Sequence, residues 1–397
     1  RDDGQYIVHN DGEQIVNASA KEVTRGFLYD REFENPNLSF SEPDLSLSKD
    51  LGKTLFKILA HENIASREPI YEKYDKQVQG RVNVESGVAD SGVLTPFNST
   101  DYPKEIRKVG IALSTDHNPR YSMISPYWGG VNAVVEAMRN VASVGATPHA
   151  ITDCLCYGNP EKPKQMWEFV EGTRGISDAC NAITLKDNPS YPTPIIAGNV
   201  SFYNESKNGP IPPSPIVSCL GRLKDIDYVL PMHFQSSGSD ILMVGERKDE
   251  LGGSIYYQLL GELGANVPKP DFVEVRSQIF AVTDCAEGGL ILSCHDISDG
   301  GIATSIAEMT FRKNIGCLVN IPGDLQAHKL LFSETGGFVI ETKKENTENV
   351  IEVFKAHGLQ ASKIGETGGE YIQLNETIKV KVREARHRWE NGLREKL

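Results

Sequence analysis

The chain has 397 residues, of which 39% are hydrophobic and 24% charged, and it carries a formal net charge of −13. This composition is typical of a globular protein large enough for two domains, and the acidic charge argues against nucleic acid or an anionic membrane as a partner. No segment has the apolar length needed to span a bilayer, and the N-terminal residues lack the pattern of a signal peptide.

Residues 1–24 contain two β-rich runs, Tyr6–His9 and Gln14–Val16, separated by the turn signal Asn10-Asp11-Gly12. This pattern predicts a small β-hairpin. A hairpin alone is not a domain, and the chain begins at Arg1 instead of a methionine. We therefore expect these residues to be the C-terminal remnant of a missing upstream domain.

Residues 25–50 are rich in Asn, Pro and Ser and are predicted to be a linker. Two α/β domains are expected to follow, at residues 51–222 and 237–397. The expected strands are Val109–Thr115, His149–Leu155, Ile195–Ala197, Ile216–Gly221, Ile241–Val244 and Leu290–Leu292, and the expected helices are Val131–Val144, Pro163–Ala182, Ile302–Phe311 and Arg383–Leu397.

Asp153 is the most informative residue of the first domain, because it lies near the end of a predicted strand. A loop rich in Gly and Pro, residues 157–163, follows it and leads into a helix. Such a loop can present a carboxylate and backbone amides to a nucleotide or a metal. The alternative interpretation is that Asp153 only caps a turn.

A second strand end, at residues 195–205, brings Gly198, Asn199 and Ser201 together. Gly198 lets a ligand approach the backbone, Asn199 offers an amide oxygen to a hard cation, and Ser201 offers a hydroxyl group. A polar turn is the alternative here too. If both strands belong to one sheet, we expect Asp153 and Asn199 to face one shared magnesium-nucleotide site.

Two further glycine motifs are open to both structural and functional interpretations. Gly129-Gly130, ahead of the first helix, marks either a helix cap or a phosphate cradle. In the second domain, a strand-to-helix turn is expected to use Ser298 or Asp299 as the N-cap, and it is also a candidate anion site. The residues of this candidate anion site are His295, Asp296, Ser298, Asp299, Gly300 and Gly301.

The seven cysteines form no paired framework. Cys154 and Cys156 are separated by one residue, which is too few for the usual zinc knuckle. We interpret all seven as reduced cytosolic thiols and expect a cytoplasmic protein.

In this order and spacing, the motifs resemble those of phosphoribosylformylglycinamidine synthase over nearly the whole chain. The segments that carry the resemblance are Tyr29–Arg31, Asn63–Ser66, Tyr71–Asp75, Gly130–Pro163, Gly198–Glu205 and His295–Met309. The chain departs from the family at Cys156, where the family usually has Asn, and in an insertion at about Leu185–Tyr191.

The resemblance implies an α/β fold with mixed sheets, in a two-domain unit of the aminoimidazole ribonucleotide synthetase-like superfamily. It identifies the chain as the second of two tandem copies of this unit in the synthetase subunit. The implied reaction is the ATP-dependent conversion of formylglycinamide ribonucleotide to the amidine. Ammonia for this reaction comes from a glutaminase subunit, with a small bridging subunit in the assembly.

By position, the resemblance assigns Asp153 and Gly198 to ATP, Asn199 to Mg2+ and Ser201 to the substrate. It places the family's catalytic histidine in the upstream half, so no catalytic residue is assigned in this chain. One alternative is a structural half that binds nucleotide or supports the upstream half without turnover. Another is aminoimidazole ribonucleotide synthetase itself, against which the motifs around Asp153 and Asn199 argue.

Overall fold

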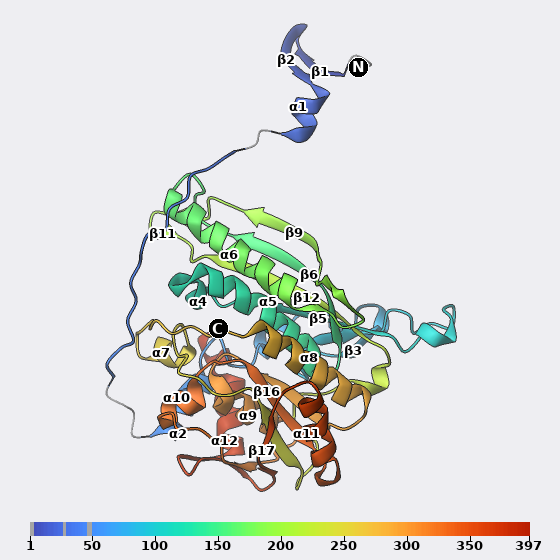
Figure 1. Ribbon diagram of the computed structural model, residues 1–397, viewed down its shortest axis with the longest axis vertical. Helices are drawn as coiled ribbons and strands as arrows, with labels where there is room; N and C mark the ends of the chain where they lie inside the picture. Colours follow the sequence, from blue (N-terminus) through green and yellow to red (C-terminus); the bar gives the residue numbers. More distant parts are fainter. Residues whose placement is uncertain (1–3, 27–28, 46–49) are drawn as a thin grey trace.

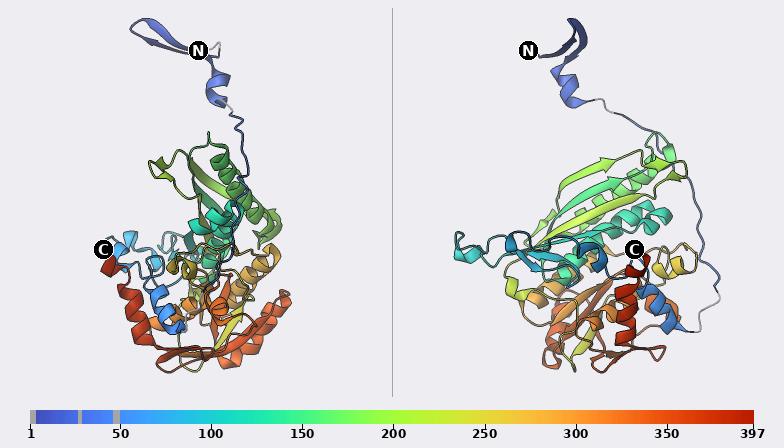
Figure 2. Two further views of the ribbon diagram at one scale, coloured as in Figure 1. Left: turned by 90° about the vertical axis from the view of Figure 1, so that its left-hand side faces the viewer. Right: turned by 180° about the vertical axis from the view of Figure 1, so that it is seen from behind.

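The computed structural model describes residues 4–26, 29–45 and 50–397. In this part of the chain, two large mixed or antiparallel sheets are separated by helices, and a small hairpin projects from the N-terminal end (Figures 1 and 2). The α/β class with mixed sheets, expected from the sequence, is confirmed.

The N-terminal hairpin consists of β1 (Gln5–Asn10) and β2 (Glu13–Ser19), paired antiparallel as predicted. Asp11 and Gly12 at its tip have φ angles of 49° and 86°, the left-handed conformation that tight hairpin turns require. A short helix that the sequence analysis did not anticipate, α1 (Ala20–Arg25), follows and is capped by Ser19. No side chain of the hairpin or of this helix is fully buried, so they have no core of their own.

The predicted linker contains neither helix nor strand in residues 29–45, while residues 27–28 and 46–49 lie outside the described residues. It runs along the side of the molecule (Figure 1). Glu42 fixes it, because its carboxylate accepts hydrogen bonds from the backbone N–H groups of Ala265 and Asn266, both at 2.7 Å, and from the Tyr257 hydroxyl at 2.6 Å.

The first large sheet has six strands, and its edge strand β9 pairs in parallel with β6. In spatial order the strands are β3 (Val82–Val84), β4 (Gly92–Leu94), β5 (Gly110–Asp116), β12 (Ser214–Leu223), β6 (Thr147–Cys156) and β9 (Ile195–Ser201). The helices of this part are α4 (Pro119–Ile124), α5 (Pro126–Ser143) and α6 (Pro163–Ala182), and α5 packs directly on the sheet. In the described part of the chain nothing covers the opposite face, and Leu113 on it is 54% exposed.

Two short antiparallel strand pairs lie in the loops that connect the strands of this sheet. They are β7 (Thr184–Leu185) with β8 (Asn188–Pro192), and β10 (Glu205–Ser206) with β11 (Gly209–Pro210). The first pair contains the predicted insertion at Leu185–Tyr191. Its Lys186 lies beside Asp284 of the helix α8 (Phe272–Glu287), with an Nζ–Oδ1 distance of 2.6 Å. The insertion therefore contacts the second half of the chain.

The second large sheet has seven strands and is covered on both faces. In spatial order they are β14 (Ser293–Ile297), β16 (Gly337–Thr342), β13 (Asp240–Val244), β17 (Ala361–Thr367), β15 (Cys317–Val319), β18 (Tyr371–Leu374) and β19 (Ile378–Lys381). Alternate residues of β13 enter different cores. Leu242 packs with the cluster that includes residues of α5, α8 and α11 (Thr347–Ala356). Ile241 packs instead with residues of α2 (Leu51–Leu59) and α9 (Gly301–Phe311).

The remaining helices surround this sheet. They are α2 (Leu51–Leu59), α3 (Glu68–Tyr71), α7 (Ile255–Leu259), α8 (Phe272–Glu287), α9 (Gly301–Phe311), α10 (Ala327–Phe332), α11 (Thr347–Ala356) and α12 (Val382–Asn391). Single 3-10 turns are found at Val78–Gly80, Lys104–Ile106, Ile226–Tyr228, Lys344–Asn346 and Arg394–Lys396.

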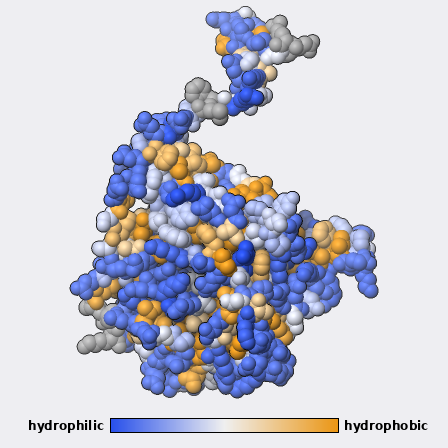
Figure 3. All heavy atoms as spheres, in the orientation of Figure 1, coloured by the Kyte–Doolittle hydropathy of each residue, from blue (hydrophilic) through white to orange (hydrophobic). Residues whose placement is uncertain are grey.

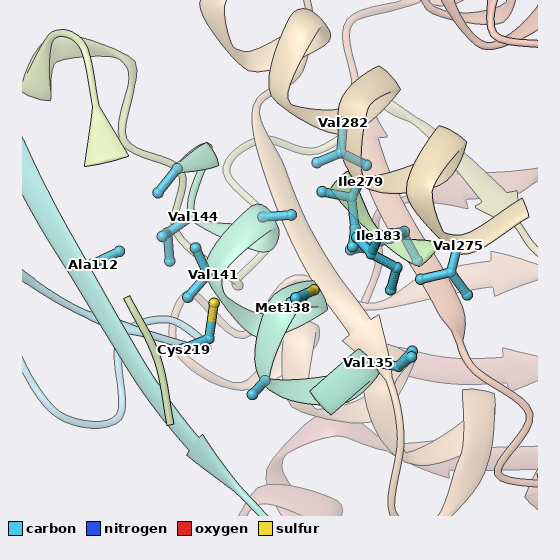
Figure 4. Close-up of a cluster of buried hydrophobic side chains, with 14 of the residues drawn as sticks. Ala112, Val135, Met138, Val141, Val144, Ile183, Cys219, Val275, Ile279 and Val282 are labelled. Atoms are coloured by element: carbon cyan, nitrogen blue, oxygen red, sulfur yellow. The ribbon is translucent and has the colours of Figure 1, made fainter. Parts of the chain in front are cut away.

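The two sheets share one hydrophobic core, which lies between them (Figure 4). Met138 and Val141 of α5 meet Cys219 of the first sheet, and the same cluster continues into Ile279 and Val282 of α8. The predicted domain boundaries, residues 51–222 and 237–397, stay a prediction. The helix α2 falls in the first of these ranges but packs with α9 and α12 of the second.

Most of the predicted strands and helices are confirmed to within a few residues, and α6 has the bounds that were predicted for it. The strand predicted at Leu290–Leu292 is wrong. The strand is β14, which begins at Ser293, and it contains His295 and Asp296 inside the sheet. The polar residues of β14 can lie inside the sheet because they have buried partners. For example, the Ser293 hydroxyl donates a 2.9 Å hydrogen bond to the Glu341 carboxylate.

Candidate functional site

The two motifs singled out in the first domain lie side by side in the sheet. In the parallel pair β6–β9, Asp153 is opposite Gly198, Cys154 is opposite Asn199, and Cys156 is opposite Ser201. We call Asp153, Gly198, Asn199 and Ser201 the strand-edge site, because β9 is the last strand of the sheet. Both strands run on beyond the positions expected from the sequence, so Asp153 lies within β6 and not at its end.

Gly198 makes room for the carboxylate of Asp153. A Cβ atom added at Gly198 would lie 2.3 Å from Asp153 Oδ1, closer than any real contact allows. The glycine is therefore required if the carboxylate is to lie over the neighbouring strand. Burial raises the pKa of Asp153 above its ordinary value.

Asn199 and Ser201 point to the opposite, bare face of the sheet. Asn199 Nδ2 lies 3.4 Å from the sulfur of Cys154, and the Ser201 hydroxyl contacts Asn204. The expectation that Asp153 and Asn199 face one shared site is wrong as a statement about side-chain direction. Successive residues of a strand alternate between faces, and Asn199 follows the residue that pairs with Asp153.

The loops that follow β6 and β9 are fastened to each other. Tyr157 N donates to Ser201 O at 2.9 Å, and Tyr203 N donates to Gly158 O at 2.8 Å. The ammonium group of Lys162 lies 2.6 Å from the Glu205 carboxylate. These contacts hold the strand-edge site on a defined scaffold.

Gly129-Gly130 serves packing instead of forming a phosphate cradle. Both residues lie in the first turns of α5. A Cβ atom at Gly129 would collide with Ser122, and one at Gly130 would lie 2.2 Å from the carbonyl oxygen of Gly172 on α6. The glycines let α5 approach α4 and α6 closely.

A second group of polar residues lies between the two sheets, and it was largely missed from the sequence. We call it the junction cluster, and it consists of Asp90, Asp116, Glu136, Arg139, His295, Asp296 and Asp299. Its members come from the loop before β4, the end of β5, the helix α5 and the segment that begins in β14. Only the β14 segment was singled out from the sequence.

Close contacts tie the junction cluster together. His295 Nδ1 lies 2.8 Å from Asp90 Oδ1, and Asp296 N donates to Asp90 Oδ2 at 3.0 Å. Arg139 Nε lies 3.8 Å from Asp296 Oδ2, and neither of these two buried atoms has a hydrogen-bond partner among the described residues. These two atoms therefore depend on the ion pair between them.

Burial raises the pKa values of several carboxyl groups in the junction cluster. Burial, and then the neighbouring carboxylates, raise the pKa of Asp116 to about 8 and that of Asp296 to about 7. The pKa of Glu136 is raised well above its ordinary value for the same two reasons. Burial alone would lower the pKa of His295, but the carboxylates of Asp90 and Glu308 outweigh it and raise this pKa.

At the start of α9, where an anion site was predicted, the N-cap residue and the neighbouring charges differ from those expected. Gly300, with a φ of 81°, is the N-cap, so Ser298 and Asp299 do not have this role. Gly300 N already donates to the carboxylate of Glu334 at 2.7 Å. With His295 clamped by carboxylates and Asp296 and Asp299 close by, an anion alone is disfavoured here. Gly301 packs against the backbone after Leu331.

A cation is better suited to this region. Asp90, His295 and Asp296 each offer one ligand atom, and these atoms lie within 4.8 Å of one another. A sequence signal for the cluster existed in α5, where Glu136, Arg139 and Asn140 interrupt an otherwise apolar helix. Asn140 donates to Asp116 at 3.0 Å, so polar residues within an apolar stripe were the clue.

Comparison with known proteins places this fold in a class. The chain matches the AIR synthase related protein N-terminal domain over residues 90–223 and the C-terminal domain of the same family over residues 236–374. The chain therefore belongs to the AIR synthase related family, and it contains both domains of its two-domain unit.

Within this family the chain is similar to phosphoribosylformylglycinamidine synthase subunit PurL, which confirms the resemblance noted in the sequence. It is 43% identical to the PurL subunit of Methanothrix thermoacetophila over 98% of this chain and 51% of that protein. It is 33% identical to the PurL subunit of Nocardioides sp. over 99% of this chain and 51% of that protein. The chain thus spans about half the length of these curated relatives.

A solved structure of T. maritima PurL complexed with FGAR shares the fold, with a TM-score of 0.65 and 19% identity over 84% of this chain and 53% of that one. The structure of PurLQS from Thermotoga maritima gives a TM-score of 0.63, at 18% identity over 83% of this chain and 51% of that one. None of the helices in the described part of the chain is both long and apolar enough to cross a membrane.

Proposed function

We propose that this chain is one half of an ATP-dependent ligase that converts formylglycinamide ribonucleotide to formylglycinamidine ribonucleotide in purine biosynthesis. The observation that carries the proposal is the parallel pairing of β6 with β9. It aligns Asp153 with Gly198 and sets Asn199 and Ser201 directly beyond them. Similarity to PurL subunits over almost the whole chain supports the same reaction.

The position of β9 at the edge of the sheet explains how residues on two faces could serve one ligand. An edge strand has one side free of strand pairing. A ligand that lies along this free side can reach the backbone at Gly198, the carboxylate of Asp153 on one face and the amide of Asn199 on the other. The site therefore wraps around a strand and is not confined to one face.

The donor set fits a magnesium-nucleotide. Asn199 offers a neutral oxygen, which Mg2+ accepts alongside water and phosphate oxygens. Ser201 offers a hydroxyl group to the substrate, and Asp153 accepts hydrogen bonds from the nucleotide. When bound, ATP supplies the phosphoryl group that activates the formamide oxygen towards displacement by ammonia. The residues of this chain bind and orient the reactants, as phosphoryl transfer requires.

The proposed partners follow from the same assignment. They are the upstream half of the enzyme, a glutaminase subunit that supplies ammonia and a small bridging subunit. The bare face of the first sheet, with Leu94 46% and Leu113 54% exposed, supports an apolar partner such as the upstream half. The seven free cysteines accord with a cytoplasmic location.

A structural half without turnover is the second candidate. It is favoured by one observation, namely that the chain spans about half of its relatives. The two candidates predict different results for variants of an enzyme that contains both halves. There, the proposed site predicts that changes at Asp153 and Asn199 alter the kinetics, whereas a supporting half predicts that they alter only stability.

The test uses the complete enzyme with ammonia supplied directly. We expect Asn199→Ala to lower turnover at saturating substrate by about a hundredfold, because a metal ligand acts mainly in the transition state. Asp153→Ala should raise the KM for ATP by about tenfold, the effect of losing a hydrogen bond to a charged group. Asn181→Ala, on the exposed surface of α6, is the control and should change neither value. Normal kinetics with a lowered melting temperature would contradict the site.

A further inference from the structure

Two cysteines form an unusual pair on the bare face of the first sheet. Cys154 and Cys156 are separated by one residue of β6, so both side chains point to the same face. Their sulfur atoms lie 3.8 Å apart, and both side chains are partly exposed. The other five cysteines of the chain are buried. Accessible thiol chemistry is therefore concentrated at this one place.

We propose that Cys154 and Cys156 form a two-sulfur binding site for a soft metal ion, with Zn2+ as the representative ion. A tetrahedral zinc ion binds cysteine sulfur at about 2.3 Å, which places two sulfur ligands of one ion about 3.8 Å apart. The pair already has this separation. An ion can thus be held by both sulfurs without a change in the strand. The one-residue spacing that rules out a zinc knuckle in a loop is suitable on a strand.

A disulfide is the competing use of such a pair, and the backbone disfavours it. Residues two apart in a strand have Cα atoms about 6.6 Å apart, near the upper limit for a disulfide. The strand β6 cannot shorten easily, because it is hydrogen-bonded to β12 on one side and to β9 on the other. The two thiols therefore remain available as separate ligands.

One polar side chain contacts the pair, while burial raises the pKa of Cys156. Asn199 Nδ2 lies 3.4 Å from Cys154 Sγ, in position to donate a hydrogen bond to it. Such a hydrogen bond strengthens when the sulfur is ionised. On binding, two metal–sulfur bonds form and the two thiol protons leave to the solvent, while water completes the coordination. This inference goes beyond the proposed ligase reaction and does not depend on it, because binding is measured directly.

The experiment titrates the reduced 397-residue chain with Zn2+ against a chromophoric chelator, and in parallel with Cd2+, whose thiolate complexes absorb in the ultraviolet. We expect one equivalent of metal and a cadmium–thiolate absorption band. Cys154→Ser and Cys156→Ser should each weaken binding by at least tenfold. Cys156→Asn, which restores the residue usual in the family, should do the same. The control Cys180→Ala, which removes a buried thiol of α6, should leave the affinity unchanged.

The proposal is overturned if the double variant Cys154→Ser/Cys156→Ser binds Zn2+ with unchanged affinity, since the ion would then be held elsewhere, for example by Asp90, His295 and Asp296. It is also overturned if no cadmium–thiolate band appears in the wild-type chain. Circular dichroism checks the folding of each variant. If the double variant does not fold, the single variant Cys156→Asn decides the outcome by the same criteria.

Discussion

The strand-edge site and the junction cluster both consist of polar residues, but the first is open to solvent and the second is buried. At the strand-edge site, Asn199 is exposed and β9 has a free side, so the residues can serve a ligand from outside. In the junction cluster, Arg139 and Asp296 are almost completely buried between the two sheets. The face of the molecule seen in Figure 3 is mostly hydrophilic, with scattered hydrophobic residues. A polar group at an exposed edge can be changed at little cost in stability, whereas one in a closed junction cannot.

The same contrast separates the two sheets themselves. The second sheet has a core on each face, while the first has a core on one face and bare apolar side chains on the other. We infer from this difference that the first sheet has a face available for binding, whereas substitutions within the second sheet cost more stability. The following predictions test that division.

The largest effect is expected when the positive charge of the junction cluster is removed. Arg139→Ala should lower the free energy of unfolding by about 3–5 kcal/mol, because it removes the buried guanidinium that pairs with the carboxylates of Glu136 and Asp296. Arg174→Ala removes a pair with Glu171 whose arginine is 57% exposed, and it should cost less than about 0.5 kcal/mol. Urea denaturation of both variants measures the difference. Equal losses of stability would show that a charge in the junction cluster is no more important for folding than a charge on the surface.

The next effect compares one leucine from each sheet. Leu242→Ala should cost about 2–5 kcal/mol, because the side chain is fully buried in the second sheet. Leu113→Ala, on the bare face of the first sheet, should change stability by less than about 0.5 kcal/mol in the isolated chain. The measurement is again denaturation. A large loss for Leu113→Ala would mean that the bare face is covered in solution, for example by a second copy of the chain.

Much of this architecture was predictable from the sequence, because it depends on local patterns. The apolar periodicity and end signals of α6 gave its bounds, and the Asn-Asp-Gly signal gave the N-terminal hairpin. Strand-end chemistry singled out Asp153 and Asn199, but their adjacency was expected only on the condition that both strands belong to one sheet, which the pairing of β6 with β9 fulfils. The direction of each side chain did not follow from the sequence, because it depends on the register of β6 with β9, and a shift of one residue reverses the face.

The junction cluster could not be assembled from the sequence, because its members are far apart in the chain. Asp90 and Asp296 are brought together only by the packing of the two sheets around α5 and α8. The strand β14 was misplaced for a related reason. Its polar residues do not look like a buried strand unless their partners, such as Glu341 and Glu308, are known.

The smallest effect concerns pH and follows from the raised pKa values in the junction cluster. In the unfolded chain an aspartate has a pKa of about 3.9, whereas the folded chain holds that of Asp116 at about 8 and that of Asp296 at about 7. Between these values the two carboxyl groups bind more protons in the folded state than in the unfolded state, so the stability that they contribute is present at low pH and is lost as the pH rises through their folded pKa values. We expect a loss of about 1–2 kcal/mol between pH 6 and pH 8 in a buffer with a metal chelator. The free energy of unfolding, measured by urea denaturation across this range, checks the slope. Asp296→Asn should reduce the slope, since it removes one titrating group, while Asp187→Asn, at a half-exposed surface pair, should leave it unchanged. A stability that rises between pH 6 and pH 8 would contradict the closed, carboxylate-rich junction and would place these groups in contact with solvent, as at the strand edge.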